Sequence, residues 1–102
     1  MDKKQIIKIS KKYIIKINEF LPLENAFLFG SYVNGKPRKD SDIDIGLLSE
    51  SRIKDYYSIL QKLYHERQNI DVRIEPHLFI KRYDPAGFYA EVIKNSLNLL
   101  KH

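Results

Sequence analysis

Residues 26–46 read AFLFGSYVNGKPRKDSDIDIG, and the architecture can be worked out from this segment. It begins with the apolar and aromatic residues 26–29, which predict a short buried strand. Gly30 and Ser31 follow directly, so we expect the strand to end in a sharp turn. A brief helix is expected to begin at Ser31.

The second half of the same segment predicts a loop and another strand. Residues 34–42 combine turn-forming residues with charges, which is typical of an exposed loop. The strand is expected to run from Asp42 or Ile43 to Leu48. Because Asp42 and Asp44 are separated by one residue, an extended backbone would point both carboxylates to the same face of the sheet.

Two parts of this pattern fit phosphate and metal chemistry. Gly30 can adopt backbone angles closed to other residues and lets a phosphate approach the main chain. A helix that begins at Ser31 would add free N–H groups and a hydroxyl for an anion. Carboxylates on one face attract a hard divalent cation, and magnesium commonly shares such ligands with substrate phosphates. A paired site of this kind holds two ions about 3.5 to 4 Å apart, so Asp42 and Asp44 favour phosphoryl chemistry.

A third strand is predicted over residues 70–75, where charged and apolar residues alternate. This alternation places Asp71 and Arg73 on the carboxylate face. Asp71 is then a third carboxylate, which either binds the second metal or takes the proton from an attacking hydroxyl. Arg73 either binds a triphosphate or neutralises the aspartates.

Gly46 on the second strand either leaves space for substrate or marks a strand bulge. Glu75 either supports the site or is a surface acid at the strand end, and the surface acid is favoured.

Helices are predicted around these strands. Residues 2–21 and 52–68 each carry apolar side chains at helical spacing. A last helix is expected to open at Asp84, with Pro85 in its first turn, and to run through Leu100. The predicted fold is α+β, with a small mixed sheet, helices packed on one face and the carboxylates on the other.

The composition is that of a small folded protein. The chain has 102 residues, 43% hydrophobic and 30% charged, so we expect a single domain over residues 1–102. Cysteine is absent, no apolar run reaches the length of a bilayer, and the lysine-rich start lacks the features of a secretory signal. We therefore expect a cytoplasmic protein without a membrane segment.

His65 and His77 have no companion at ligand spacing, and we expect them on a helix surface and in a loop, respectively.

The charge balance leaves a second class of partner open. Lys and Arg number 18 against 13 Asp and Glu, a net charge of +5, and many of the lysines lie in the first predicted helix. They form either a surface for nucleic acid or a solvated helix face. The solvated face is favoured, because charged residues ordinarily occupy that side of a helix.

Together, these residues resemble a known family. The Gly30-Ser31 pair, the ten-residue gap, the Asp42-x-Asp44 pair and the later Asp71 are similar to the motifs of the nucleotidyltransferase superfamily that includes DNA polymerase beta and kanamycin nucleotidyltransferase. Within it, the short length and the run DSDID resemble the minimal nucleotidyltransferases of the MntA type, which are antitoxins found beside HEPN toxins.

The resemblance implies a palm-like nucleotidyltransferase fold and the Mg²⁺-dependent transfer of a nucleoside monophosphate from a triphosphate, ATP, with release of pyrophosphate. It implies two magnesium ions held by Asp42, Asp44 and Asp71. The terminal phosphates would be held at Gly30 and Ser31. The implied partner is a HEPN ribonuclease toxin, adenylylated on a tyrosine hydroxyl.

The chain also departs from the family pattern. Many relatives carry an arginine soon after the Gly-Ser pair, where this chain has Tyr32 and Asn34, and Arg38 in the loop is the basic substitute. If Arg73 neutralises the aspartates, the chain is a catalytically silent antitoxin that neutralises its toxin by binding alone. A basic nucleic-acid-binding module is the remaining alternative.

Overall fold

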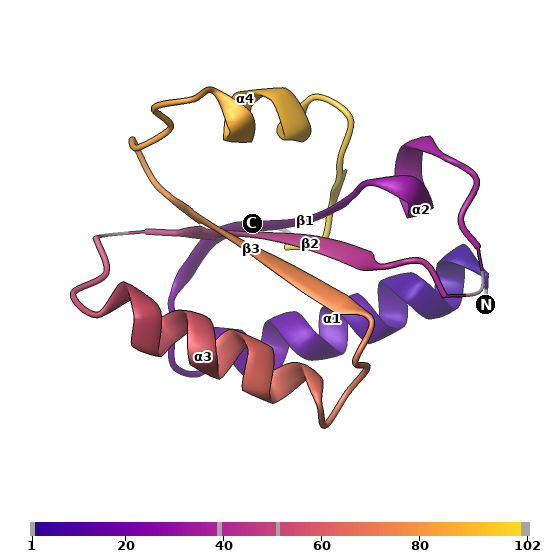
Figure 1. Cartoon of the computed structure of the whole chain (residues 1–102), viewed down its shortest axis with the longest axis horizontal. Helices are drawn as coiled ribbons and strands as arrows, with labels where there is room; N and C mark the ends of the chain where they lie inside the picture. The colour runs from indigo at the N-terminus through magenta and orange to yellow at the C-terminus, as the bar shows by residue number, and fades with distance from the viewer. Residues whose placement is uncertain (1, 39, 51, 101–102) are drawn as a thin grey trace.

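A mixed β-sheet forms the centre of the computed structural model, which describes residues 2–38, 40–50 and 52–100 (Figure 1). The strand order is β3-β2-β1-β4, with β1 antiparallel to β2 and β4, and β2 parallel to β3. The predicted α+β fold with a small mixed sheet is therefore confirmed. In chain order, the elements are α1 (Lys3–Asn18), β1 (Leu23–Phe29), α2 (Ser31–Asn34), β2 (Ile43–Ser49), α3 (Tyr56–Arg67), β3 (Ile74–Ile80), α4 (Phe88–Ile93) and β4 (Leu97–Asn98).

The first helix forms for local reasons and is held by long-range packing. Asp2 caps it: its carboxylate accepts a hydrogen bond from the Gln5 N–H at 2.9 Å, and the Gln5 side chain accepts one from the Asp2 N–H at 3.2 Å. The hydroxyl of Tyr13, fully buried, donates to the carbonyl of Leu63 in α3 at 2.7 Å. None of the helices in the described part of the chain is long and apolar enough to cross a bilayer.

The two faces of the sheet carry different cores. Helices α1 and α3 cover one face, where they pack on Ile43, Ile45 and other apolar residues of the strands. Helix α4 lies over the opposite face, on a smaller cluster that includes Phe27 and Phe79 (Figure 1). Gly46 belongs to this second face, and a Cβ there would overlap the ring of Phe27. The glycine thus makes room for an aromatic ring, rather than for substrate or a bulge.

The predicted bounds of the third strand, residues 70–75, were wrong, because β3 begins only at Ile74 and ends at Ile80. The backbone after α3 continues through hydrogen-bonded turns, including one from the Asp71 N–H to the Arg67 carbonyl at 2.8 Å. Val72, which strand alternation would have buried, has 65% of its surface exposed. Asp71 and Arg73 therefore lie before the strand and not on its face.

The last helix is shorter than predicted. It begins only at Phe88, with Gly87 at the N-cap, so the predicted start at Asp84 and Pro85 was wrong, and it ends at Ile93. The Asp84 carboxylate nevertheless accepts hydrogen bonds from the N–H groups of Tyr89 and Ala90 at 3.0 Å each. The Ser96 hydroxyl then donates to the Ile93 carbonyl at 2.9 Å, a local bond that competes with further helix. The remaining residues form β4, which pairs with β1.

Candidate functional site

The Gly-Ser turn and the second aspartate meet at one end of the sheet. Gly30 has φ 81° and ψ −151°, a region of backbone space that is essentially restricted to glycine. A Cβ at this position would overlap the Oδ2 atom of Asp44. The short helix α2 follows directly from Ser31, as predicted, and Asp44 is the cross-strand partner of Phe29, the last residue of β1. Gly30 is thus required both by its backbone angles and by the carboxylate beside it.

The two aspartates lie at the start of β2. Ile43 and Ile45 are fully buried against the helices, so Asp44 points to the other face, with 24% of its side chain exposed. Asp42 comes immediately before the strand and is exposed. Within residues 2–38, 40–50 and 52–100, no hydrogen bond or ion pair holds the Asp42 carboxylate. Its oxygens are therefore accessible to a ligand.

A histidine that the sequence did not indicate joins Asp44. His77 was expected in a loop, but it lies in β3, and its Nε2 is 3.0 Å from the Oδ1 atom of Asp44. Its ring packs edge-on against Phe29, with centroids 4.8 Å apart. His65 lies exposed on α3, as predicted. No periodicity in the sequence marks His77, because its place depends on how β3 pairs with β2.

Glu75 lies directly opposite Asp44 in the parallel pairing of β2 with β3, but its carboxylate is drawn towards α3. The Tyr64 hydroxyl donates to its Oε1 atom at 2.9 Å, and Arg67 lies 3.7 Å from its Oε2 atom. Burial, followed by this hydrogen bond, raises the pKa of Tyr64 above its usual value. Glu75 is thus engaged by a neighbouring helix, not simply a surface acid.

Asp71 is paired with Arg73. The Arg73 guanidinium donates to both carboxylate oxygens, at 3.0 Å from Nε and 2.6 Å from the terminal nitrogen, and the Arg73 N–H adds a third bond at 2.9 Å. These hydrogen bonds lower the pKa of Asp71 below its usual value, against the opposing effect of its partial burial. Pairing of Arg73 with an aspartate, one of its two alternative roles, is present here, but it arises from a turn and not from strand alternation.

The loop between α2 and β2 is braced through its main chain. The Arg38 N–H donates to the Ser41 hydroxyl at 2.7 Å, and the Tyr32 hydroxyl donates to the Arg38 carbonyl at 3.5 Å. Lys39, which falls within the predicted loop, lies outside the described residues. The Arg38 side chain is exposed, and among the described residues it makes no ion pair with Asp42 or Asp44.

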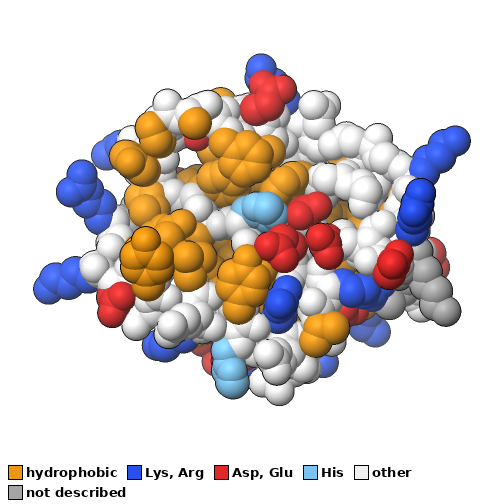
Figure 2. All heavy atoms as spheres, viewed as in Figure 1, with side chains coloured by type: hydrophobic (Ala, Val, Ile, Leu, Met, Phe, Trp, Pro, Cys, Tyr) orange, Lys and Arg blue, Asp and Glu red, His pale blue; other side chains and the backbone are white. Residues whose placement is uncertain are grey.

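The side chains present fit a magnesium ion that shares its coordination with a nucleotide. The described residues contain no group of three or more His, Cys, Asp or Glu side chains able to hold a metal ion by themselves. Magnesium, however, is usually bound through one or two carboxylates, with water and substrate phosphates completing the shell. Asp42 and Asp44 supply that donor set. Figure 2 shows acidic side chains gathered beside a histidine near the middle of the visible face.

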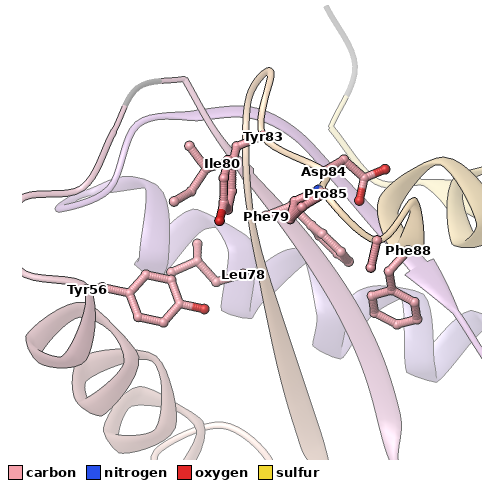
Figure 3. A pocket seen from close by; sticks show the side chains of 9 residues that line it. Tyr56, Leu78, Phe79, Ile80, Tyr83, Asp84, Pro85 and Phe88 are labelled. Atoms are coloured by element: carbon pink, nitrogen blue, oxygen red, sulfur yellow. The ribbon is translucent and has the colours of Figure 1, made fainter.

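An apolar groove of about 340 Å³ lies apart from these carboxylates, at the far end of β3 (Figure 3). Tyr56 from the start of α3 lies on one side of the strand and Phe88 on the other. Its acidic residue, Asp84, already accepts two hydrogen bonds from the N–H groups at the start of α4. The groove therefore offers contact surface rather than reactive groups.

Comparison with known proteins agrees with this geometry. A family model described as polymerase beta, nucleotidyltransferase matches residues 4–102. A candidate nucleotidyltransferase from Sulfolobus solfataricus has the same fold, with a TM-score of 0.70, 19% identity, and coverage of 98% of this chain and 84% of that chain.

Two toxin–antitoxin structures are also similar. One, a complex with AMP-PNP, is 25% identical over 90% of this chain and 73% of that chain, with a TM-score of 0.62. The other, MntA–HepT, is 21% identical over 93% and 73%, with a TM-score of 0.60. No curated protein matches the sequence.

Proposed function

This chain belongs to the polymerase beta nucleotidyltransferase family, and we propose that it is a Mg²⁺-dependent enzyme that transfers AMP from ATP to a protein toxin. The observation that carries the proposal is the contact between Gly30 and Asp44. It brings the turn suited to phosphates next to a carboxylate suited to a cation, as transfer from a metal-bound triphosphate requires.

Each residue of the site has an assigned role. Asp42 and Asp44 hold the cation, and the main chain at Gly30 with the hydroxyl of Ser31 holds the terminal phosphates. Magnesium, when bound, neutralises charge on the triphosphate and orients it. Arg38 lies exposed in the loop between the turn and β2, where its guanidinium is available to the phosphates.

The reaction is a substitution at the α-phosphorus of ATP. A hydroxyl oxygen of the acceptor forms a bond to that phosphorus, and the bond from the phosphorus to the oxygen bridging it to the β-phosphate breaks. Pyrophosphate leaves, and the proton of the hydroxyl passes to water or to a carboxylate of the site. Catalysis then depends mainly on positioning and charge stabilisation.

The proposed acceptor is a toxin encoded with this chain. Support comes from the likeness to a toxin–antitoxin structure with AMP-PNP, which is 25% identical to this chain. The sequence resemblance to MntA-type antitoxins narrows the acceptor to a HEPN ribonuclease, modified on a tyrosine hydroxyl. Adenylylation would add a bulky anion to the toxin, and this would account for neutralisation.

A second function is favoured by one specific observation. The Asp71 carboxylate is bonded to Arg73, so it does not join Asp42 and Asp44 as a third metal ligand in this structure. A chain with two carboxylates but no third is also compatible with an antitoxin that binds its toxin without transferring a nucleotide.

Co-expression with the cognate toxin separates the two functions. The toxin should carry an AMP adduct by mass spectrometry, and this adduct should be absent when the antitoxin carries Asp42→Asn with Asp44→Asn. The double variant should still bind the toxin in a pull-down, which serves as the control for folding. Neutralisation of the toxin by the wild-type chain without an adduct would contradict the enzyme and support the binding-only antitoxin.

A further inference from the structure

We propose that His77 is a positioning residue: its imidazole holds the Asp44 carboxylate in the orientation that receives the nucleotide-bound cation. One oxygen of the carboxylate, Oδ1, is turned towards β3 and contacts His77 Nε2 at 3.0 Å. The other, Oδ2, lies against Gly30. The inference rests on the function proposed above, and it assigns a role to a residue outside the Gly-Ser and Asp-x-Asp motifs.

The sheet register explains why a histidine two residues along β3 reaches Asp44. In the parallel pairing of β2 with β3, Asp44 lies opposite Glu75, and Gly46 lies opposite His77. All four residues share one face of the sheet, since each pair is in register and the members of a strand are two residues apart. Tyr64 holds Glu75 towards α3, so the space beside Asp44 is open to the imidazole.

Aromatic packing fixes the plane of the imidazole. Phe29, the partner of Asp44 in β1, meets the His77 ring edge-on at 4.8 Å and an interplanar angle of 62°. The ring centroid of Phe88, the first residue of α4, lies 6.3 Å from that of His77. Only 28% of the His77 side chain is exposed. The ring therefore has a defined orientation, with Nε2 directed at the carboxylate.

The contact requires a hydrogen on Nε2, because the Asp44 carboxylate can only accept. Because Oδ1 is satisfied by His77, Oδ2 is the oxygen directed at the Gly-Ser turn, where the cation would meet the phosphates. Groups that orient a metal ligand in this way typically change metal affinity by about 10- to 100-fold when removed.

Two substitutions separate the hydrogen bond from the packing. His77→Gln keeps an N–H donor at nearly the reach of Nε2 but loses the ring, whereas His77→Phe keeps a ring against Phe29 but loses the donor. Binding of Mn²⁺ with a non-hydrolysable ATP analogue would be measured by calorimetry, beside thermal unfolding of each variant. We expect His77→Phe to weaken Mn²⁺ binding by about 10- to 100-fold and His77→Gln to retain most of the wild-type affinity.

The outcomes distinguish this inference from the proposed function. If the wild-type protein binds Mn²⁺ with the analogue and a folded His77→Phe binds equally well, His77 does not position Asp44, while the proposed function stands. Equal loss in both folded variants would assign the effect to the ring and overturn the hydrogen-bond role. If the wild type binds the analogue no better with Mn²⁺ than without, the proposed function fails, and the inference fails with it. Should His77→Phe not fold, a weakened His77→Gln would likewise contradict the role of the donor.

Discussion

Replacing Gly30 with alanine tests whether the turn and the carboxylate are built as one unit. The backbone there, at φ 81° and ψ −151°, costs about 1 to 3 kcal/mol for a residue with a Cβ. The new methyl group would also overlap Asp44 Oδ2 and displace the carboxylate from His77, a hydrogen bond worth about 0.5 to 1.5 kcal/mol. We therefore expect Gly30→Ala to lower the free energy of unfolding by about 1.5 to 4.5 kcal/mol.

Gly87 offers a matched control. It also has a positive φ, 70°, but a Cβ at this position would meet nothing within 4 Å. Gly87→Ala should lose only the backbone term, about 1 to 2 kcal/mol, and should keep metal-dependent nucleotide binding. Urea unfolding gives the stabilities, and calorimetry with Mn²⁺ and an ATP analogue gives the affinities. If Gly30→Ala matches Gly87→Ala in both measurements, the contact with Asp44 is not what requires glycine at position 30.

Three further substitutions probe other contacts. Gly46→Ala should destabilise the protein by about 1 to 3 kcal/mol in urea unfolding, because its Cβ would overlap the Phe27 ring; a neutral effect would show that the ring can move. Tyr13→Phe should cost about 0.5 to 1.5 kcal/mol by the same assay, since the buried hydroxyl donates to a carbonyl of α3 at 2.7 Å, and no loss would mean that this bond contributes nothing net. Asp71→Asn should be less stable than wild type at neutral pH. The pKa of Asp71 is lower in the folded than in the unfolded protein, so the stability that this carboxylate contributes is present above its unfolded pKa and is lost as pH falls through its folded pKa. A difference in unfolding free energy that does not change with pH would contradict the pairing with Arg73.

Local patterns account for the parts of the fold that could be predicted. The strand before Gly30, the short helix at Ser31 and the exposed loop before Asp42 each depend on neighbouring residues, and all three are present. The predicted second strand is present as well, with Asp44 as its second residue and Asp42 immediately before it. These features could be predicted because each depends on a few consecutive residues, such as a glycine suited to positive φ or two polar residues at strand spacing.

The third strand was predicted too early in the chain, because residues 74–80 lack the usual signals of a strand. Pro76 and His77 interrupt the apolar pattern of β3, and proline argues against a central strand. It is tolerated because β3 lies at the edge of the sheet. Residues 70–75 showed a clean alternation instead, but Asp71 accepts a hydrogen bond from the N–H of Arg73 and forms a turn. His77 contacts Asp44 because of the way β3 pairs with β2, so its contribution to the site could not be predicted from the sequence.

The position of β3 also bears on how the molecule behaves at high concentration. An exposed edge strand is a template on which other chains can pair and aggregate. The Ile43 N–H donates to the Arg73 carbonyl, so the even-numbered residues of β3 turn their main-chain groups outward. Arg67 already donates to the outward carbonyl of Ile74 at 2.9 Å, Pro76 has no N–H to offer, and the Ile80 carbonyl accepts from Tyr83 at 3.0 Å. Pro76, which interrupts the apolar pattern of β3, thus also helps to prevent a second molecule from pairing with this edge.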